Sequence, residues 1–358
     1  MVYDFNKFST YGKNKFATQL SDLEFNNARL QLMVKVVQAY FELLYAEDYL
    51  QATVMTKNAL NKQLEDANKS FKIGSIMIAD VNDAKSGYDS ASAQQIQAEN
   101  EVINRKNMFT NVTGLNPDMA QPVIESIDLV YPAPDDIEEW VHMAKAGNLD
   151  IKIATKKMEM AIKDIDIAKS GHLPVVSFQG TYTIQGTANV TSTDSGATMQ
   201  LVNTLQAIPG FPLSSYSNAV AMLQISIPIS SGGGVSSQIR QQISNYEVAR
   251  DNLLSKEREV DKEVRNAFLQ VRNGVEIVSA EAQALKSARI KLQSDTTGYK
   301  IGVRNSINLV NSQRNYYQTW QSYNKARYTY LASRVQLEYL TGKIDQGFLQ
   351  VINNNIKQ

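Results

Sequence analysis

The chain has 358 residues, with 36 Lys and Arg against 36 Asp and Glu, so its formal net charge is zero. This balance gives no electrostatic reason to expect a nucleic-acid partner, because phosphate binding needs a basic surplus on one face. With no Cys and only 2 His, the chain lacks disulfides, thiolate nucleophiles, Cys-based zinc sites and three-His metal centres. No stretch approaches the ~18–20 unbroken apolar residues of a membrane-spanning helix. This criterion does not exclude membrane-spanning strands, because their apolar and polar residues alternate.

Two proline-free stretches predict long helices. No Pro precedes Pro117 and none follows Pro228, so helices on either side are free to run without a break. We expect them over about residues 9–70, 79–113, 235–297 and 307–340. In the third, apolar residues recur every seven positions, which is typical of coiled-coil packing. These residues are Val264, Val271, Val278, Leu285 and Leu292.

The two helical regions are copies of one unit. At a fixed offset of 228 residues, Lys72-Ile73-Gly74 matches Lys300-Ile301-Gly302 and Thr113-Gly114 matches Thr341-Gly342. No gap is needed between residues 36 and 114 of the first copy. The repeated unit therefore reads as long helix, glycine turn, long helix and glycine stop, which is a helical hairpin occurring twice.

The middle of the chain combines short helices with strands. Asp135 to Glu138 predicts a capped short helix that ends at Gly147-Asn148, where another begins and runs to about Gly171. Residues 176–185 then alternate apolar and polar side chains, and the alternation returns from Leu223 to Ile229. This period of two predicts strands with one apolar face, separated by a Gly/Ser/Thr/Asn-rich loop over residues 187–217.

No catalytic constellation emerges. Gly232-Gly233-Gly234 follows a strand but lacks the Lys-Ser/Thr of a phosphate loop, so a structural turn is favoured. Neither His142 nor His172 has an acidic or nucleophilic residue at a sequence spacing that would indicate a catalytic pair. The acidic run from Asp135 to Glu139 suits a helix N-terminus, where carboxylates cap the helix and favour its dipole. We therefore expect no enzyme, no cofactor and no metal.

The duplicated turns resemble those of the TolC-like outer membrane efflux protein family. The resemblance is carried by residues 299–309 and 71–81, by the helix-to-strand junction Ala168-Lys169-Ser170-Gly171-His172-Leu173-Pro174, and by residues 227–234. It implies a mainly α fold with a β-barrel portion, in which long antiparallel helical hairpins form an α-barrel tunnel in the periplasm. It also implies a homotrimer in which each protomer gives four strands to a shared twelve-stranded barrel in the Gram-negative outer membrane.

By the same resemblance the chain divides into five regions. Residues 1–116 form the first repeat, 117–171 an equatorial region with the helix before the strands, and 172–231 the outer membrane strands with an extracellular loop. Residues 232–342 form the second hairpin and 343–358 an equatorial tail. The apolar strand faces then meet lipid, while polar residues such as Gln179 and Gln224 face a wet lumen.

The resemblance also implies a periplasmic gate at the hairpin tips. Tyr299 and Arg304 match a constricting pair, and Asp80 matches the acidic partner on the other hairpin. Asn308 and Asn311 stand where the family has a ring of Asp, which argues against a strongly negative mouth. The function implied is a passive exit duct for efflux or type I secretion, opened by a periplasmic adaptor and an inner-membrane transporter.

A plainer interpretation of the tips stays open. The gate candidates, including Asp83, also suit helix caps and a solvated turn. The adaptor is expected to dock around the two turn glycines, Gly74 and Gly302.

By the pattern of the second repeat, we expect the helix and the first strand of the first repeat to lie before Met1, with residues 2–5 as a remnant of a strand's end. The chain also opens without a signal peptide, so we expect an N-terminally truncated sequence in which Met1 is an internal residue. Two other functions stay open: a periplasmic adaptor, which needs only one hairpin, and a coiled-coil scaffold, which leaves the alternating strands unexplained. Detergent-free fractionation separates them, because only the duct must sediment with outer membranes.

Overall fold

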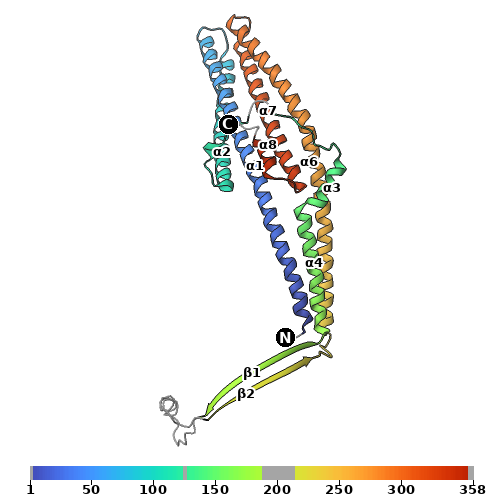
Figure 1. Ribbon diagram of the computed structural model, residues 1–358. Coiled ribbons are helices and arrows are strands. Elements are labelled where there is room, and N and C mark those ends of the chain that lie inside the picture. Colours follow the sequence, from blue (N-terminus) through green and yellow to red (C-terminus); the bar gives the residue numbers. More distant parts are fainter. Residues whose placement is uncertain (1–2, 124–126, 188–213, 354–358) are drawn as a thin grey trace, which may run out of the picture. The chain divides into compact units, whose positions relative to one another are not determined.

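The computed structural model describes residues 3–123, 127–187 and 214–353 (Figure 1). Two compact units make up the chain, one of residues 1–18 and 156–250 and the other of residues 19–155 and 251–358. Helices α1 (Phe5–Lys72), α4 (Leu149–Lys169) and α6 (Gly234–Lys300) contribute residues to both units.

The four predicted long helices are confirmed as α1, α2 (Ile78–Thr113), α6 and α7 (Ser306–Leu340). Their ends lie within a few residues of the predicted ones, because glycine turns stop them and no internal proline breaks them. The 68 residues of α1 give a rod on the order of 100 Å long at 1.5 Å per residue. Across the described residues, none of the helices is both long and apolar enough to cross a membrane.

The two hairpin turns share one backbone geometry. Gly74 and Gly302 have φ of 76° and 78°, in the left-handed region that glycine adopts without strain. In each turn the glycine N–H donates to the carbonyl three residues back, and the next N–H donates to the carbonyl five residues back. This arrangement satisfies the last carbonyls of α1 and α6 in the same way, so the repeat predicted from sequence extends to individual hydrogen bonds.

The core of the second unit lies along α6. Val264, Val271 and Val278 of the seven-residue row are almost fully buried, whereas Leu285 and Leu292 are half-buried. The buried part of the row joins one apolar cluster with residues of α1, α3 (Ile137–Gly147) and α7. Its largest members from those helices are Phe41, Trp140, Tyr328 and Tyr330. The side chains of the seven-residue row are therefore most deeply buried near the short helices and less buried towards the hairpin turn.

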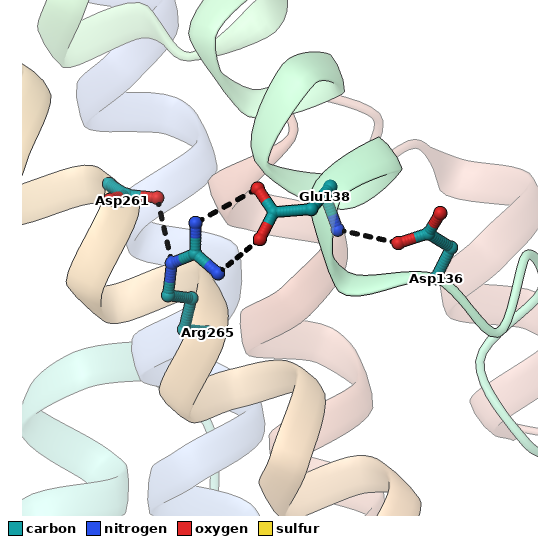
Figure 2. A network of polar contacts seen from close by, with 4 residues as sticks. All are labelled: Asp136, Glu138, Asp261 and Arg265. Carbon is teal, nitrogen blue, oxygen red and sulfur yellow. Dashed lines mark hydrogen bonds and ion pairs between the residues drawn. The ribbon is translucent and has the colours of Figure 1, made fainter.

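The acidic run before α3 has the structural role that the sequence predicts. Asp136 Oδ1 accepts from the Glu138 backbone N–H at 2.9 Å and caps the helix. Glu138 reaches α6, where Arg265 Nη1 and Nη2 contact its two carboxylate oxygens at 2.6 and 3.0 Å, while Arg265 Nε contacts Asp261 at 3.1 Å (Figure 2). The guanidinium lowers the pKa of the Glu138 carboxyl. This network fastens the start of α3 to α6.

The first unit carries a two-stranded antiparallel sheet of β1 (Val175–Thr187) and β2 (Ser214–Ser226) (Figure 1). Phe178 pairs with Leu223 and Val176 with Ile225, so the predicted apolar residues of both strands share one face. Side chains of this face are exposed in the single chain, 62% for Leu223.

The strand predictions need two corrections. β2 ends at Ser226, so Ile227 and Ile229 lie beyond the strand that was predicted to include them. Pro228, which has no N–H to donate, fits this early end. The predicted loop begins and ends inside the strands, and its residues 188–213 lie outside the described residues.

Two further elements complete the description. Tyr3 exchanges backbone hydrogen bonds with Val176, in line with the expectation that residues 2–5 hold a strand end. A short helix, α8 (Gln346–Asn353), lies in the region predicted as a tail.

Candidate functional site at the hairpin tips

The tips of the two hairpins, the α1–α2 and α6–α7 turns, both belong to the second unit. Each exposes aliphatic side chains next to its glycine: Ile73 is 80% exposed and Ile301 is 71% exposed. Met77 and Val303 are exposed as well. Aliphatic side chains gathered at an exposed turn are typical of a surface that another protein covers.

A hydrogen bond joins the two hairpins near their tips. The Tyr299 hydroxyl, in the last turn of α6, donates to Asp66 Oδ2 of α1 at 2.8 Å. The hydrogen bond to the Asp66 carboxylate raises the pKa of the Tyr299 phenol, because it stabilises the protonated hydroxyl. Lys69 Nζ lies 3.8 Å from the other oxygen of Asp66. Asp66 therefore holds the second hairpin against the first.

Arg304 is paired within its own hairpin. Its Nε lies 3.4 Å from Asp295 Oδ1, and the Ser312 hydroxyl donates to Asp295 Oδ2. Asp295 is buried in α6, whereas the Arg304 side chain is 56% exposed. A carboxylate, a hydroxyl and a guanidinium thus connect α6, the turn and α7.

Asp80 and Asn308 occupy equivalent positions at the starts of α2 and α7. Asp80 Oδ2 accepts from the Met77 N–H at 3.0 Å, and the Asn308 N–H donates to Asn305 Oδ1 at 2.9 Å. Both contacts are helix caps, the plainer of the two roles considered from sequence. Near the turns, Asp66 is hydrogen-bonded to the other hairpin, whereas the contact of Asp80 stays on its own helix. Asp83 and Asn311 are exposed on α2 and α7.

Sequence reasoning did not single out Asp66, Asp295 or Ser312. For Asp295 a signal was present, since it falls at seven-residue spacing from a row of small buried residues of α6. That row includes Val260, Ala267, Gly274 and Ala288, whereas its remaining member, Glu281, is only half-buried. A carboxylate in such a row is unusual, because a buried charge needs partners. Asp66 carried no comparable signal, because its role depends on a tyrosine 233 residues away.

Within the part of the chain that the structure describes, no three His, Asp or Glu side chains gather as metal ligands would. The features of the site are instead long paired helices, an inter-hairpin hydrogen bond and exposed apolar tips. These define a helical-hairpin protein with exposed apolar side chains at its hairpin turns.

Comparison with known proteins gives the family. Residues 2–115 and 140–343 match the family model described as outer membrane efflux protein. TolC of Escherichia coli (strain K12) is 26% identical over 358 residues, which cover 100% of this chain and 70% of TolC. The alkaline protease secretion protein AprF of Pseudomonas aeruginosa is 23% identical, with 99% of this chain and 70% of AprF covered. The crystal structure of the CmeC outer membrane channel of Campylobacter jejuni aligns with a TM-score of 0.75 at 16% identity, covering 99% of this chain and 72% of CmeC.

The chain belongs to the outer membrane efflux protein family. It is an exit duct of the Gram-negative outer membrane, with its helices in the periplasm, and it serves efflux or secretion. Its relatives are channel proteins rather than enzymes and work as part of larger export systems.

Proposed function

We propose that three copies of this chain assemble into one duct that is closed at the hairpin tips by Tyr299, Asp66 and Arg304. A periplasmic adaptor binds around Gly74 and Gly302 and, with an inner-membrane transporter, opens the duct. Export then runs through the duct without catalysis by the chain itself.

Two features support an assembly of several copies. The sheet of the first unit has two strands: β2 leaves one edge without a neighbour among the described residues, and the second edge of β1 is paired among them at Val176 alone, by Tyr3. Open edges are not tolerated in lipid, so strands beyond this pair, including those of neighbouring copies, must satisfy those backbone groups. In the second unit, α1, α2 and α6 expose Phe25, Ile96 and Ile290, which helices of a neighbouring copy would cover.

The Tyr299–Asp66 hydrogen bond is the observation that carries the proposed gate. It joins the two hairpins next to their turns, so an outward movement of the second hairpin must break it. A hydrogen bond to a charged acceptor contributes about 1.5–3 kcal/mol, and the threefold arrangement repeats it in every copy. The exposed Arg304 is placed to add a contact to the next copy.

The exposed tips support the proposed docking of an adaptor. Ile73 and Ile301 flank the two turn glycines and extend the apolar surface beyond the helix ends. We assign residues 117–171 and 343–358 to an equatorial region around the helical tunnel, and residues 172–231 to the membrane.

Single-channel recording of the complete protein in planar lipid bilayers tests the gate. Tyr299→Phe and Arg304→Ser are each expected to raise the conductance of the closed duct, because each removes a donor that holds the tips together. The matched control is Tyr328→Phe, which removes a 2.6 Å hydrogen bond to Asp48 that also links α7 to α1 but lies in the core. Unchanged conductance in both variants would show that Tyr299 and Arg304 do not hold the gate closed.

A further inference from the structure

A carboxylate is buried at the tip of the second hairpin. Asp295 is 6% exposed and Ser312 is 1% exposed, and the serine hydroxyl donates to Asp295 Oδ2. Burying a carboxylate is unfavourable unless charged or hydrogen-bonding partners surround it. Here the charged partner is Arg304, whose Nε lies 3.4 Å from the free oxygen of Asp295.

Gly298 gives Arg304 the room to reach that carboxylate. A Cβ at Gly298 would lie 2.6 Å from Cγ of Arg304, so any larger residue would push the side chain away from α6. The Gly298 carbonyl also accepts from the backbone N–H groups of Val303 and Arg304 at 2.9 and 3.1 Å. Arg304 is therefore held against α6 through both its backbone and its side chain.

The first hairpin shows that the turn itself does not need this cluster. At the offset of 228 residues, Ala67 and Ala84 replace Asp295 and Ser312, and Ile76 replaces Arg304. The two turns nevertheless share the backbone hydrogen bonds of the glycine and of the residue after it, and they have nearly the same glycine φ. A buried polar cluster that is absent from an otherwise equivalent hairpin points to a role other than forming the turn.

We propose that Asp295 is a positioning residue of the gate, which holds Arg304 so that its guanidinium can bind a carboxylate of the neighbouring copy. Within the described residues, the ion pair of Arg304 uses Nε, and the side chain is half exposed. The two terminal nitrogens thus stay available for the bidentate contact that guanidinium makes with a carboxylate. Fixing a side chain as flexible as arginine before the contact forms reduces the entropy lost on binding.

The inference rests on the proposed gate, and its test is a double-mutant comparison in the complete protein in planar bilayers. Asp295→Asn keeps the shape of the side chain but removes its charge. We expect the ratio of open to closed time to rise about tenfold, which corresponds to the loss of ~1.4 kcal/mol of charge-assisted hydrogen bonding. Arg304→Ser should raise the ratio at least as much, and the double variant should match Arg304→Ser alone. Ser312→Ala should cause a smaller rise, because the carboxylate loses its fixed orientation.

Asp48→Asn is the control, since it alters another partly buried aspartate of the same unit away from the tips and should leave gating unchanged. A purely structural role of Asp295 predicts effects that add to those of Arg304→Ser, and this result would overturn the inference. So would an unchanged or lowered ratio in Asp295→Asn while Arg304→Ser still opens the duct, a result that leaves the gate intact. If Arg304→Ser leaves the ratio of open to closed time unchanged, Arg304 does not belong to the gate, and the inference about Asp295 is then wrong as well.

Discussion

Single polar side chains decide where several helices of this molecule begin, end and meet. Asn148 is the clearest example, because it is almost fully buried at the start of α4. Its Oδ1 accepts from the Asp150 and Ile151 N–H groups at 2.9 and 3.2 Å, and its Nδ2 donates to the Leu340 carbonyl at 2.9 Å. One amide therefore caps α4 and satisfies a carbonyl at the end of α7.

Asn148→Asp is expected to lower the free energy of unfolding by about 1–3 kcal/mol. Aspartate keeps the cap acceptor but places an oxygen against the Leu340 carbonyl, where a donor is needed. Thermal unfolding followed by circular dichroism measures the change. Asn305→Asp is the control, because Asn305 is an exposed cap that uses only its Oδ1 in contacts with the described residues. An equal loss in both variants would contradict the role assigned to Nδ2.

Asp48 gives the stability of the second unit a predicted dependence on pH. Burial raises the pKa of its carboxyl above 3.8, while the hydrogen bond from Tyr328 and the charge of Arg327 oppose the rise. The folded state then holds this proton more tightly than the unfolded state does. The contribution of Asp48 to stability is therefore largest below pH 3.8 and is lost as the pH rises through the raised pKa.

The measurement compares unfolding midpoints of the wild type and Asp48→Asn across acidic and neutral pH. The wild-type midpoint minus the variant midpoint should fall as the pH rises and then level off, because asparagine does not titrate. A difference that grows with pH would show that the partners of Asp48 lower the pKa of its carboxyl by more than burial raises it.

At the scale of elements, the long helices could be predicted from sequence because proline, glycine and the seven-residue row act locally. The end of β2 was placed too late, because the alternation continues past Ser226 into Ile227 and Ile229 although pairing has stopped. Asp66 and Asp295 were missed for a different reason. Their roles depend on side chains brought close by the folded hairpins. Only Asp295 carried a local signal, its place in a row of small buried residues, and that signal does not identify its partners.

The contact between the ends of α3 and α7 yields a prediction about elements. A Cβ at Gly147 would collide with the Thr341 carbonyl oxygen, and a Cβ at Gly342 would come within 2.6 Å of the Gly147 carbonyl oxygen. Backbone lies on both sides of this contact, so no side chain can move to make room. Gly147→Ala should therefore destabilise the protein by about 1–3 kcal/mol or more, as measured by thermal unfolding.

Gly87→Ala is the matched control in a helix. A Cβ there would meet Leu60 at an ordinary 3.5 Å, and alanine is the better helix former by about 1 kcal/mol. We expect this variant to be no less stable than the wild type. A Gly147→Ala protein as stable as Gly87→Ala would show that the α3–α7 contact is not close in solution.

At the scale of the whole molecule, the two hairpins are copies of one unit, and the residues of the proposed gate lie where the two copies differ. The two hairpins share turn geometry and cap positions. The second alone carries Tyr299, Arg304, Asp295 and Ser312, since the equivalent positions of the first hold Phe71, Ile76, Ala67 and Ala84. In the proposed trimer, this difference gives the hairpins separate tasks: the first provides Asp66 as an acceptor, and the second provides the donors that close the duct.

Electron cryomicroscopy of the complete protein in lipid nanodiscs tests the central claim most directly. Our account predicts three chains around an open axis, with lipid against the strand face that carries Phe178 and Leu223, and with Tyr299 and Arg304 at the narrowest point. A particle without a central channel, or one whose apolar strand face packs against protein instead of lipid, would contradict it.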